Sequence, residues 1–372
     1  MLKLEARSAP SQVWAYASPV LALLITVVIA VLLFISLGKD PIKGLSAFFY
    51  EPMKNVYQLT ELGIKATPLI LCALGLSVCY RSNVWNIGAE GQYLMGAVFG
   101  GGVALWVTTV GAKPGGWIIA IVLMAGMLGG MFWSGIVALL KDKFNASEIL
   151  VSLMLVYVAN LFLSYLVFGP WKDPMGFNFP QTKTFADVVS MPKLITPGRL
   201  HWGFVVALVM VGFVWFFMSK TFAGFKLRVG GLAPLAARYA GFSDRRALWT
   251  ALLLSGALAG LAGAMEATGP LGQLTPYVST GYGFTAIIVA FLGRLHPLGC
   301  VFASILLSMF LIGGELAQSR LGLPNAITGV FQGLLLFALL ACDTLINFRV
   351  RFTSSPRSPA VHGGPHMNPT QS

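Results

Sequence analysis

Charged residues and cysteines are scarce in this sequence. Only 10% of its 372 residues are charged and 56% are hydrophobic, whereas soluble domains carry roughly 25% charged residues. A soluble fold of this length cannot hide so much apolar surface, so the surrounding solvent is predicted to be lipid. The four cysteines lie within or at the ends of apolar runs, and the four histidines are scattered. We therefore expect neither a disulfide framework nor a metal site.

Acidic residues are also few, 13 against 25 basic ones, which gives a formal net charge of +12. The basic residues lie between apolar runs and not along one polar face, as the positive-inside rule expects of a membrane protein. We interpret the basic balance as contact with anionic headgroups of the lipid bilayer, and we predict no nucleic-acid partner.

A phosphate-binding loop of the form GxxxxGK[ST] is missing as well. Gly38–Asp40 lacks both the upstream glycine spacing and the hydroxyl residue. We therefore predict that this chain binds no cofactor, and that any ATP-Mg it depends on is bound by a partner subunit. A cluster of His and Asp suited to a membrane enzyme is not found either, which disfavours a catalytic role.

Ten apolar runs are present, and most reach the ~20 residues that a membrane-spanning helix needs. The eighth is short, and we expect a half-helix that joins the ninth through the turn 293–299. The fold class is predicted to be all-α, a polytopic transmembrane bundle forming one domain over residues 1–350, with a disordered cytoplasmic tail over 351–372. The runs are 16–37, 60–80, 92–110, 116–140, 148–168, 203–219, 247–268, 283–293, 299–316 and 325–346.

The densest group of basic residues lies in the segment 220–249. By the positive-inside rule this segment is cytoplasmic, and with an even number of spans both termini are cytoplasmic too. The proline-rich segment 169–202 then becomes the main external loop. The first run is longer than a signal-peptide core and lacks a cleavage site, so we expect it to be retained.

Small residues four apart occur in three runs and suit close helix packing inside the bundle, with a dimer contact as the alternative. The small-residue pairs are Gly96 with Gly100, Gly126 with Gly130, and Gly256 with Gly260.

Glu61 and Lys65 are also four apart, share one helix face and are predicted to form an interfacial ion pair. Glu266 is expected near the outer surface of the membrane, at the end of the seventh run.

Polar residues interrupt the apolar pattern between the second and third runs, at Asn86, Glu90 and Gln92. At membrane depth, such irregular backbone lines a cavity or is buried in protein. An ordinary cytoplasmic loop is the alternative. A comparable break at 280–286 precedes the eighth run. Two interrupted regions in the two halves point to inverted repeats, with runs two to five matching runs seven to ten.

The segment 220–249 is expected to contain a short exposed helix. Pro234 suits a first helical position and Gly241 suits a helix end, with good helix formers between them. This helix is either a plain connector or a docking element for a cytoplasmic partner.

Four segments together resemble the permease subunits of bacterial ATP-binding-cassette (ABC) importers of the nucleoside and simple-sugar, ribose-type family. The resemblance covers most of residues 55–350. It implies alternating access driven by cytoplasmic ATP-binding subunits, a second related permease subunit forming a heterodimer, an external substrate-binding lipoprotein, and a place in the bacterial inner membrane. The segments are 86–92, 148–155, 231–241 and 281–299.

The resemblance also implies roles for two sets of residues. One set would form a coupling helix seated on an ATPase subunit: Gly231, Pro234, Ala236, Ala237, Arg238 and Gly241. The other would border the path of the solute: Asn86, Glu90, Gln92, Glu148, Gly281, Tyr282, Phe284 and Thr285.

Three positions depart from the pattern of the family. Ala233 stands where an Asn often caps the coupling helix, a loss of ~1 kcal/mol. Val156 stands where Asn is frequent, so solute specificity would differ if that Asn contacts solute. His296 replaces a more usual Asn.

An alternative function is an ion-coupled secondary transporter of a small polar solute. Such a carrier would favour carboxylates in the middle of its spans, whereas the carboxylates here lie mostly near the ends of runs.

Overall fold

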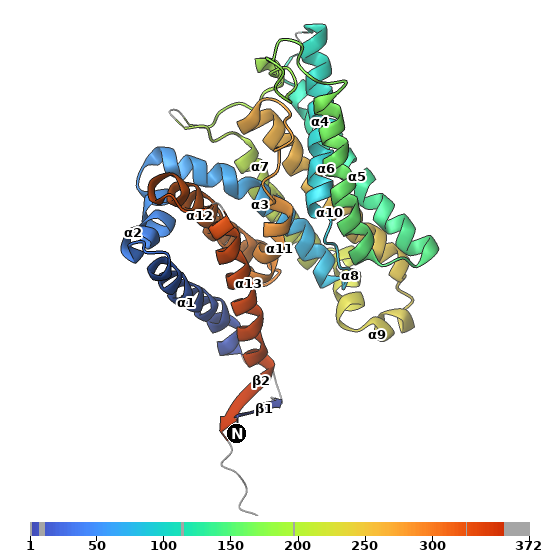
Figure 1. Cartoon of the computed structure of the whole chain (residues 1–372). Helices are drawn as coiled ribbons and strands as arrows, with labels where there is room; N and C mark the ends of the chain where they lie inside the picture. Colours follow the sequence, from blue (N-terminus) through green and yellow to red (C-terminus); the bar gives the residue numbers. More distant parts are fainter. Residues whose placement is uncertain (1, 7–11, 113–114, 196–197, 325, 353–372) are drawn as a thin grey trace, which may run out of the picture.

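The computed structural model describes residues 2–6, 12–112, 115–195, 198–324 and 326–352. Within them, nine helices are long and apolar enough to cross a membrane. The predicted all-α polytopic bundle is therefore confirmed (Figure 1). The long helices are α1 (Gln12–Ser36), α3 (Val56–Arg81), α4 (Ala89–Val110), α5 (Ile118–Phe144), α6 (Glu148–Phe168), α7 (Gly203–Lys220), α10 (Asp244–Glu266), α12 (Pro297–Leu321) and α13 (Ala326–Asn347).

The predicted half-helix is present as α11 (Tyr282–Leu292), which has 11 residues. At 1.5 Å per residue it is about 16 Å long, roughly half of the hydrocarbon thickness. The irregular segment 272–281 leads into it from the end of α10. Together they occupy the part of the chain between the ends of α10 and α12, where the sequence predicted the short eighth run.

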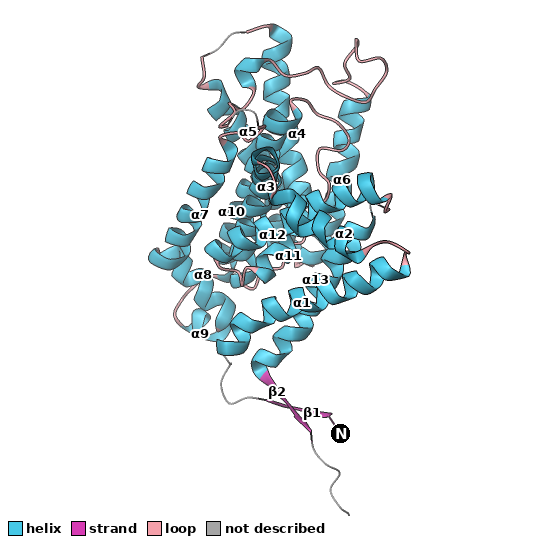
Figure 2. Cartoon of the chain, turned by 90° about the vertical axis from the view of Figure 1, so that its left-hand side faces the viewer, coloured by secondary structure: helices cyan, strands magenta, loops and turns pink. Residues whose placement is uncertain are grey.

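The two ends of the described chain lie side by side. β1 (Leu2–Ala6) pairs antiparallel with β2 (Phe348–Phe352), at the same end of the bundle as α9 (Pro234–Tyr239) in both views (Figures 1 and 2). Both ends of the described chain therefore lie at the same end of the bundle. Of the predicted disordered tail, 351–352 belong to β2, and 353–372 lie outside the described residues.

Glycines lie at the closest helix contacts in the centre of the bundle, where α10 packs against α3, α4 and α5. A Cβ atom added to Gly96 would lie 2.2 Å from the Cα of Gly260, and one added to Gly130 would lie 2.1 Å from the carbonyl oxygen of Gly256. The small-residue pairs therefore bring α4, α5 and α10 into backbone contact within one chain, as close helix packing in membranes requires.

An outer layer is formed by α1 and α13, which pack against each other. Phe48 is 2% exposed in this layer, and its ring packs on those of Phe34, Phe310 and Phe331. Hydropathy did not predict the short turns that carry Phe48. These turns are α2 (Pro41–Leu45), η1 (Ser46–Tyr50) and η2 (Glu51–Met53).

The loop 169–202, which was predicted to be external and is called the external loop below, is hydrogen-bonded to the chain that follows α10. Backbone amides of Phe185 and Met191 donate to the carbonyls of Gly272 and Thr268, at 2.7 and 2.9 Å. The loop therefore lies against the start of the segment that leads to α11. The short helical turns at this contact are η3 (Asp187–Val189) and η4 (Ala267–Leu271).

The predicted ion pair between Glu61 and Lys65 is wrong. Glu61 instead accepts two hydrogen bonds from Arg199, at 2.9 and 2.6 Å, and Lys65 lies 3.1 Å from a carboxylate oxygen of Glu315. The planar guanidinium matches both oxygens of one carboxylate, which a lysine on the same helix does not. This bidentate contact raises the pKa of Arg199 above its ordinary value.

His201, at the end of the external loop, is expected to make the fold sensitive to acid. It is 2% exposed, and burial lowers its pKa to about 4. An unfolded histidine binds a proton near pH 6.5, so stability should fall by up to ~3 kcal/mol as pH drops from about 6.5 towards 4. Thermal unfolding between pH 7 and 4.5 measures this loss.

The control for that prediction is His201→Asn. The His201 Nδ1 accepts the amide of Gly203 at 3.0 Å, and the asparagine oxygen offers a similar acceptor that does not titrate. The melting temperature of this variant should fall less steeply with acid. Equal slopes for the two proteins would contradict the prediction.

Candidate functional site

Glu90 caps the half-helix α11 from another part of the chain. It lies at the start of α4, 6% exposed, and its carboxylate accepts a 2.6 Å hydrogen bond from the amide of Gly283. It also faces the amides of Gly281 and Phe284 and the hydroxyl of Ser279. A negative charge there satisfies amides that have no helical partner and complements the helix dipole. Glu90 therefore fixes the start of α11 against α4 inside the bundle.

Asn86 and Gln92 bind each other. Each side-chain amide donates to the oxygen of the other at 3.1 Å, and Asn86 also donates to the hydroxyl of Ser255 on α10 at 3.1 Å. Both side chains are almost fully buried. The segment is thus buried in protein and is no ordinary exposed loop, and these two amides hold the α3–α4 connection against α10.

A second polar contact lies along α11. The hydroxyl of Thr285 donates to the side-chain oxygen of Gln332 on α13 at 3.3 Å, while the Gln332 Nε2 is buried without a hydrogen-bond partner. Phe284, one residue earlier, is 39% exposed. Gln332 was not among the residues predicted from the sequence, although an amide inside the tenth apolar run is the kind of signal that marks a functional position.

Five helices contribute to a group of charged and phenolic side chains, of which Tyr93, Tyr282 and Glu266 are buried. The Lys65 ammonium lies 6.0 Å from the ring centre of Tyr282, which packs on Tyr93 at 6.0 Å. Glu266 is 7% exposed and lies close enough to Lys65 for their charges to interact. Glu266 is the last residue of α10, at the end of the predicted seventh run, and it is buried because η4 and the loop 169–202 lie against the end of this helix. Glu315 completes the group through Lys65.

The remaining predicted path residues occupy separate places. Gly281 has φ +91°, which favours glycine, and this backbone turn starts α11. Glu148 is the first residue of α6, directly after the α5–α6 turn, and its carboxylate pairs with Lys141 on α5 at 3.0 Å. The structure does not bring Glu148 together with Glu90 or Tyr282.

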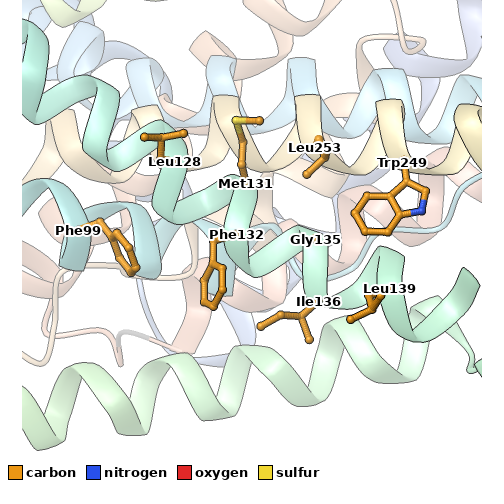
Figure 3. A pocket seen from close by; sticks show the side chains of 9 residues that line it. All are labelled: Phe99, Leu128, Met131, Phe132, Gly135, Ile136, Leu139, Trp249 and Leu253. Atoms are coloured by element: carbon orange, nitrogen blue, oxygen red, sulfur yellow. The ribbon is translucent and has the colours of Figure 1, made fainter. Parts of the chain in front are cut away.

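An apolar cavity of about 640 Å³ lies between α4, α5 and α10, where side chains such as Phe99, Phe132 and Leu253 line it (Figure 3). Its polar lining group is the indole nitrogen of Trp249, which donates to Asp142 at 3.3 Å. The cavity therefore offers apolar contacts and no free hydrogen-bonding group to a polar ligand.

The segment 220–249 forms two helices, α8 (Phe222–Leu232) and α9. Pro234 stands at the first position of α9, and Ala233 provides no side-chain cap. Gly241 closes the segment with φ +75°. The predicted short helix is thus confirmed, and so is the missing cap.

Large apolar side chains are exposed on α9 and at the end of α8 next to it. Leu235 and Tyr239 on α9 are 74% and 99% exposed, and Leu232 on α8 is 87% exposed, whereas Ala237 is buried at 1%. Arg238 forms an ion pair with Asp244 at 2.7 Å. Contiguous exposed apolar side chains at the end of a bundle mark a protein interface.

Two predicted coupling residues remain. Ala236 is exposed, and Gly231 packs on Arg81, since a Cβ at Gly231 would lie 2.1 Å from the Arg81 carbonyl oxygen.

A family described as branched-chain amino acid transport system / permease component matches residues 58–340. The chain belongs to this permease family. A glucose ABC transporter permease of Haloferax volcanii is 33% identical over 94% of this chain and 93% of its own length. The guanosine ABC transporter permeases NupP and NupQ of Bacillus subtilis are 31% and 28% identical, over 90% and 70% of this chain and 94% and 84% of their own lengths.

These relatives confirm the predicted function class. The chain is a multi-pass transmembrane permease subunit of an ABC transporter, a transport component and not an enzyme. The relatives favour ATP-driven transport over the ion-coupled carrier.

Replacing Glu90 by alanine is expected to destabilise the permease by ~1–3 kcal/mol, because the first amides of α11 lose a buried charged acceptor. Glu90→Gln keeps one acceptor oxygen and should lose less. Thermal unfolding and uptake per folded molecule measure both effects. Glu90→Gln is the isosteric comparison, and a Glu90→Ala protein that melts like the wild type would refute the capping role.

Proposed function

We propose that this permease imports a nucleoside or a simple sugar across a bacterial inner membrane, with ATP-Mg bound and hydrolysed by cytoplasmic partner subunits. Relatives named for glucose and guanosine support the solute class. Both termini are cytoplasmic in this proposal, which is supported by their position at the same end as α9 and its basic flanks.

The observation that carries the proposal is the start of α11 inside the bundle. A broken helix at membrane depth presents polar backbone where transporters bind their solutes. We place the path along the side of α11 that carries Phe284 and Thr285, next to Gln332, with Tyr282 and Gly281 at its border. Polar side chains there suit a hydroxylated solute, and Phe284 offers an aromatic face to a base or a sugar ring.

The other predicted path residues then have supporting roles. Glu90, Asn86 and Gln92 hold α11 and the α3–α4 connection from behind, since their polar atoms are engaged within the protein. Glu148 would act at the mouth of the path. Its turn lies near the start of α10, because Asp142 on α5 pairs with Arg245 at 2.8 Å.

A second, related permease subunit completes the transporter in this proposal. The Glu315 side chain is 61% exposed although α12 crosses the membrane, and a carboxylate does not face lipid without a large cost. Its face therefore suits a water-filled path or a neighbouring subunit. Two different guanosine permeases of one bacterium resemble this chain, which supports a heterodimer.

Two further partners fit opposite ends of the bundle. The exposed Leu235 and Tyr239 of α9 suit the groove of a cytoplasmic ATPase subunit. At the other end, Met175, Phe177 and Phe179 of the external loop are 86%, 93% and 65% exposed. This apolar tip suits an external substrate-binding lipoprotein.

The test is reconstitution of the permease with its ATPase subunits, second permease and binding protein in proteoliposomes. Nucleosides, glucose, pentoses and branched-chain amino acids are compared for stimulated ATP hydrolysis and uptake. Stimulation by a nucleoside or a sugar is the expected result. Stimulation by branched-chain amino acids alone would reject the proposed solute class.

A further inference from the structure

A cavity of about 750 Å³ lies between α1, the turn after α11 and α12, at the end of α3. Its wall combines two kinds of surface. Arg81, Arg294 and His296 contribute cationic or polar groups, while Val20, Leu23, Phe302 and Leu306 contribute apolar ones. The cavity is separate from the polar contacts of Glu90, Tyr282 and Thr285.

The charge of Arg294 is balanced within the protein. Its guanidinium lies 2.8 Å from the carboxylate of Asp343 on α13, and the hydroxyl of Ser18 on α1 joins the two. This group ties α1, α13 and the turn after α11 together, and it leaves no net charge for a ligand.

Arg81 is different, because its half-buried guanidinium has no carboxylate within salt-bridge distance in the described part of the chain. Arg228 on α8 lies close enough for its positive charge to act on Arg81, and the Nε of Arg228 is buried without an acceptor. Two like charges without an anion are costly at the edge of a membrane, so an anion from outside the chain is favoured here.

Two more features favour an anion beside Arg81. α12 begins at Pro297, and a helix N-terminus carries a partial positive charge. His296 accepts the amide of Leu298 on Nδ1 at 3.3 Å, so its neutral ring carries the proton on Nε2 and offers a donor. Burial and the nearby charge of Arg81 lower the pKa of His296, which keeps that ring neutral near pH 7.

The apolar part of the cavity faces the bilayer. Val20 on α1 and Phe302 on α12 are 59% and 74% exposed. The outer face of α1 continues this surface at helical spacing, as expected of a helix that touches lipid. An occupant would therefore have an anionic group at one end and hydrocarbon at the other.

We propose that this cavity binds an anionic phospholipid, with the phosphate of the headgroup at Arg81 and His296 and the acyl chains along Val20 and Phe302. Arg228 does not line the cavity, and its positive charge acts there through its closeness to Arg81. Basic pockets between transmembrane helices are suited to such headgroups. The bound lipid would link α1 and α12 to the α3–α8 contact that supports α9.

The test measures lipid binding to the full-length permease in neutral detergent, by native mass spectrometry and by the shift in melting temperature. The probes are dioleoyl phosphatidylglycerol, dioleoyl phosphatidylcholine and inorganic phosphate. Phosphatidylglycerol should bind and raise the melting temperature, and the other two should not. In Arg81→Gln/Arg228→Gln, affinity for phosphatidylglycerol should fall about tenfold or more, as loss of charge-assisted hydrogen bonds implies.

Arg246→Gln is the matched control, because Arg246 is exposed on the same end of the bundle and is not part of the cavity. It should bind phosphatidylglycerol like the wild type. Should the double variant fold poorly, Val20→Trp fills the apolar side and is expected to weaken binding as well. Equal binding of phosphatidylcholine, an equal effect of free phosphate, or undiminished binding to both variants would overturn the proposal.

Discussion

Gly260→Val is expected to abolish folding of the permease. A Cβ at this position would lie 2.2 Å from the carbonyl oxygen of Gly126 and 2.9 Å from the backbone nitrogen of Gly130. Backbone atoms of packed helices cannot move aside as a flexible side chain would, so α5 and α10 must separate. The cost is ~3 kcal/mol or more, a large share of the ~5–15 kcal/mol that stabilises an ordinary domain.

Gly212→Val on α7 is the matched control, since a Cβ there would have no atom within 4 Å. Both variants add the same side chain to a glycine inside a membrane-spanning helix. The yield of monodisperse protein in size-exclusion chromatography and its melting temperature compare them. Similar loss in both would mean that valine itself, and not helix contact, causes the defect.

The double variant Leu235→Asp/Tyr239→Asp is expected to reduce ATP-driven uptake to background while the permease stays folded. Both side chains are exposed, so the substitutions remove no internal contact. Two carboxylates would replace the apolar surface that the proposed ATPase partner covers, and central anchors of an interface cost 2 kcal/mol or more when lost. Co-purification of the ATPase and uptake in proteoliposomes measure the effect.

Met175→Asp, which is equally exposed at the opposite end, should leave co-purification of the ATPase unchanged. Ala237→Asp is a poor test of docking, because Ala237 is 1% exposed and a buried carboxylate would disturb α9 itself. Retained co-purification and uptake in Leu235→Asp/Tyr239→Asp would rule out α9 as the docking element.

The sequence predicted the helices well because a membrane imposes one strong pattern. A run of apolar residues has no other stable state in lipid than a helix, so α3 and α13 could be placed to within a few residues. The half-helix α11 was also predictable, because Gly281 and Gly293 bound an apolar run that is too short to span a bilayer. The turns around Phe48 were not, since a short buried helix leaves no periodic signal.

Pairing between distant residues could not be predicted in the same way. The spacing of Glu61 and Lys65 showed only that both share a face, and the partners Arg199 and Glu315 come from elements far away in sequence. The polar character of Asn86, Glu90 and Gln92 was evident from the sequence. Whether they contact solute or hold helices in place depends on what packs against them, and the structure shows that their polar atoms are bound within the protein.

The contact between α1 and α13 has a consequence for biosynthesis. α1 is synthesised before α3 to α12, yet it packs mainly against α13, and β1 likewise pairs with β2. While the intervening helices are made, α1 therefore has lipid where its protein partner will be, and the outer layer closes only after α13 is inserted. The order of synthesis and the order of assembly thus differ, and the central glycine-packed helices can form before the layer that surrounds them.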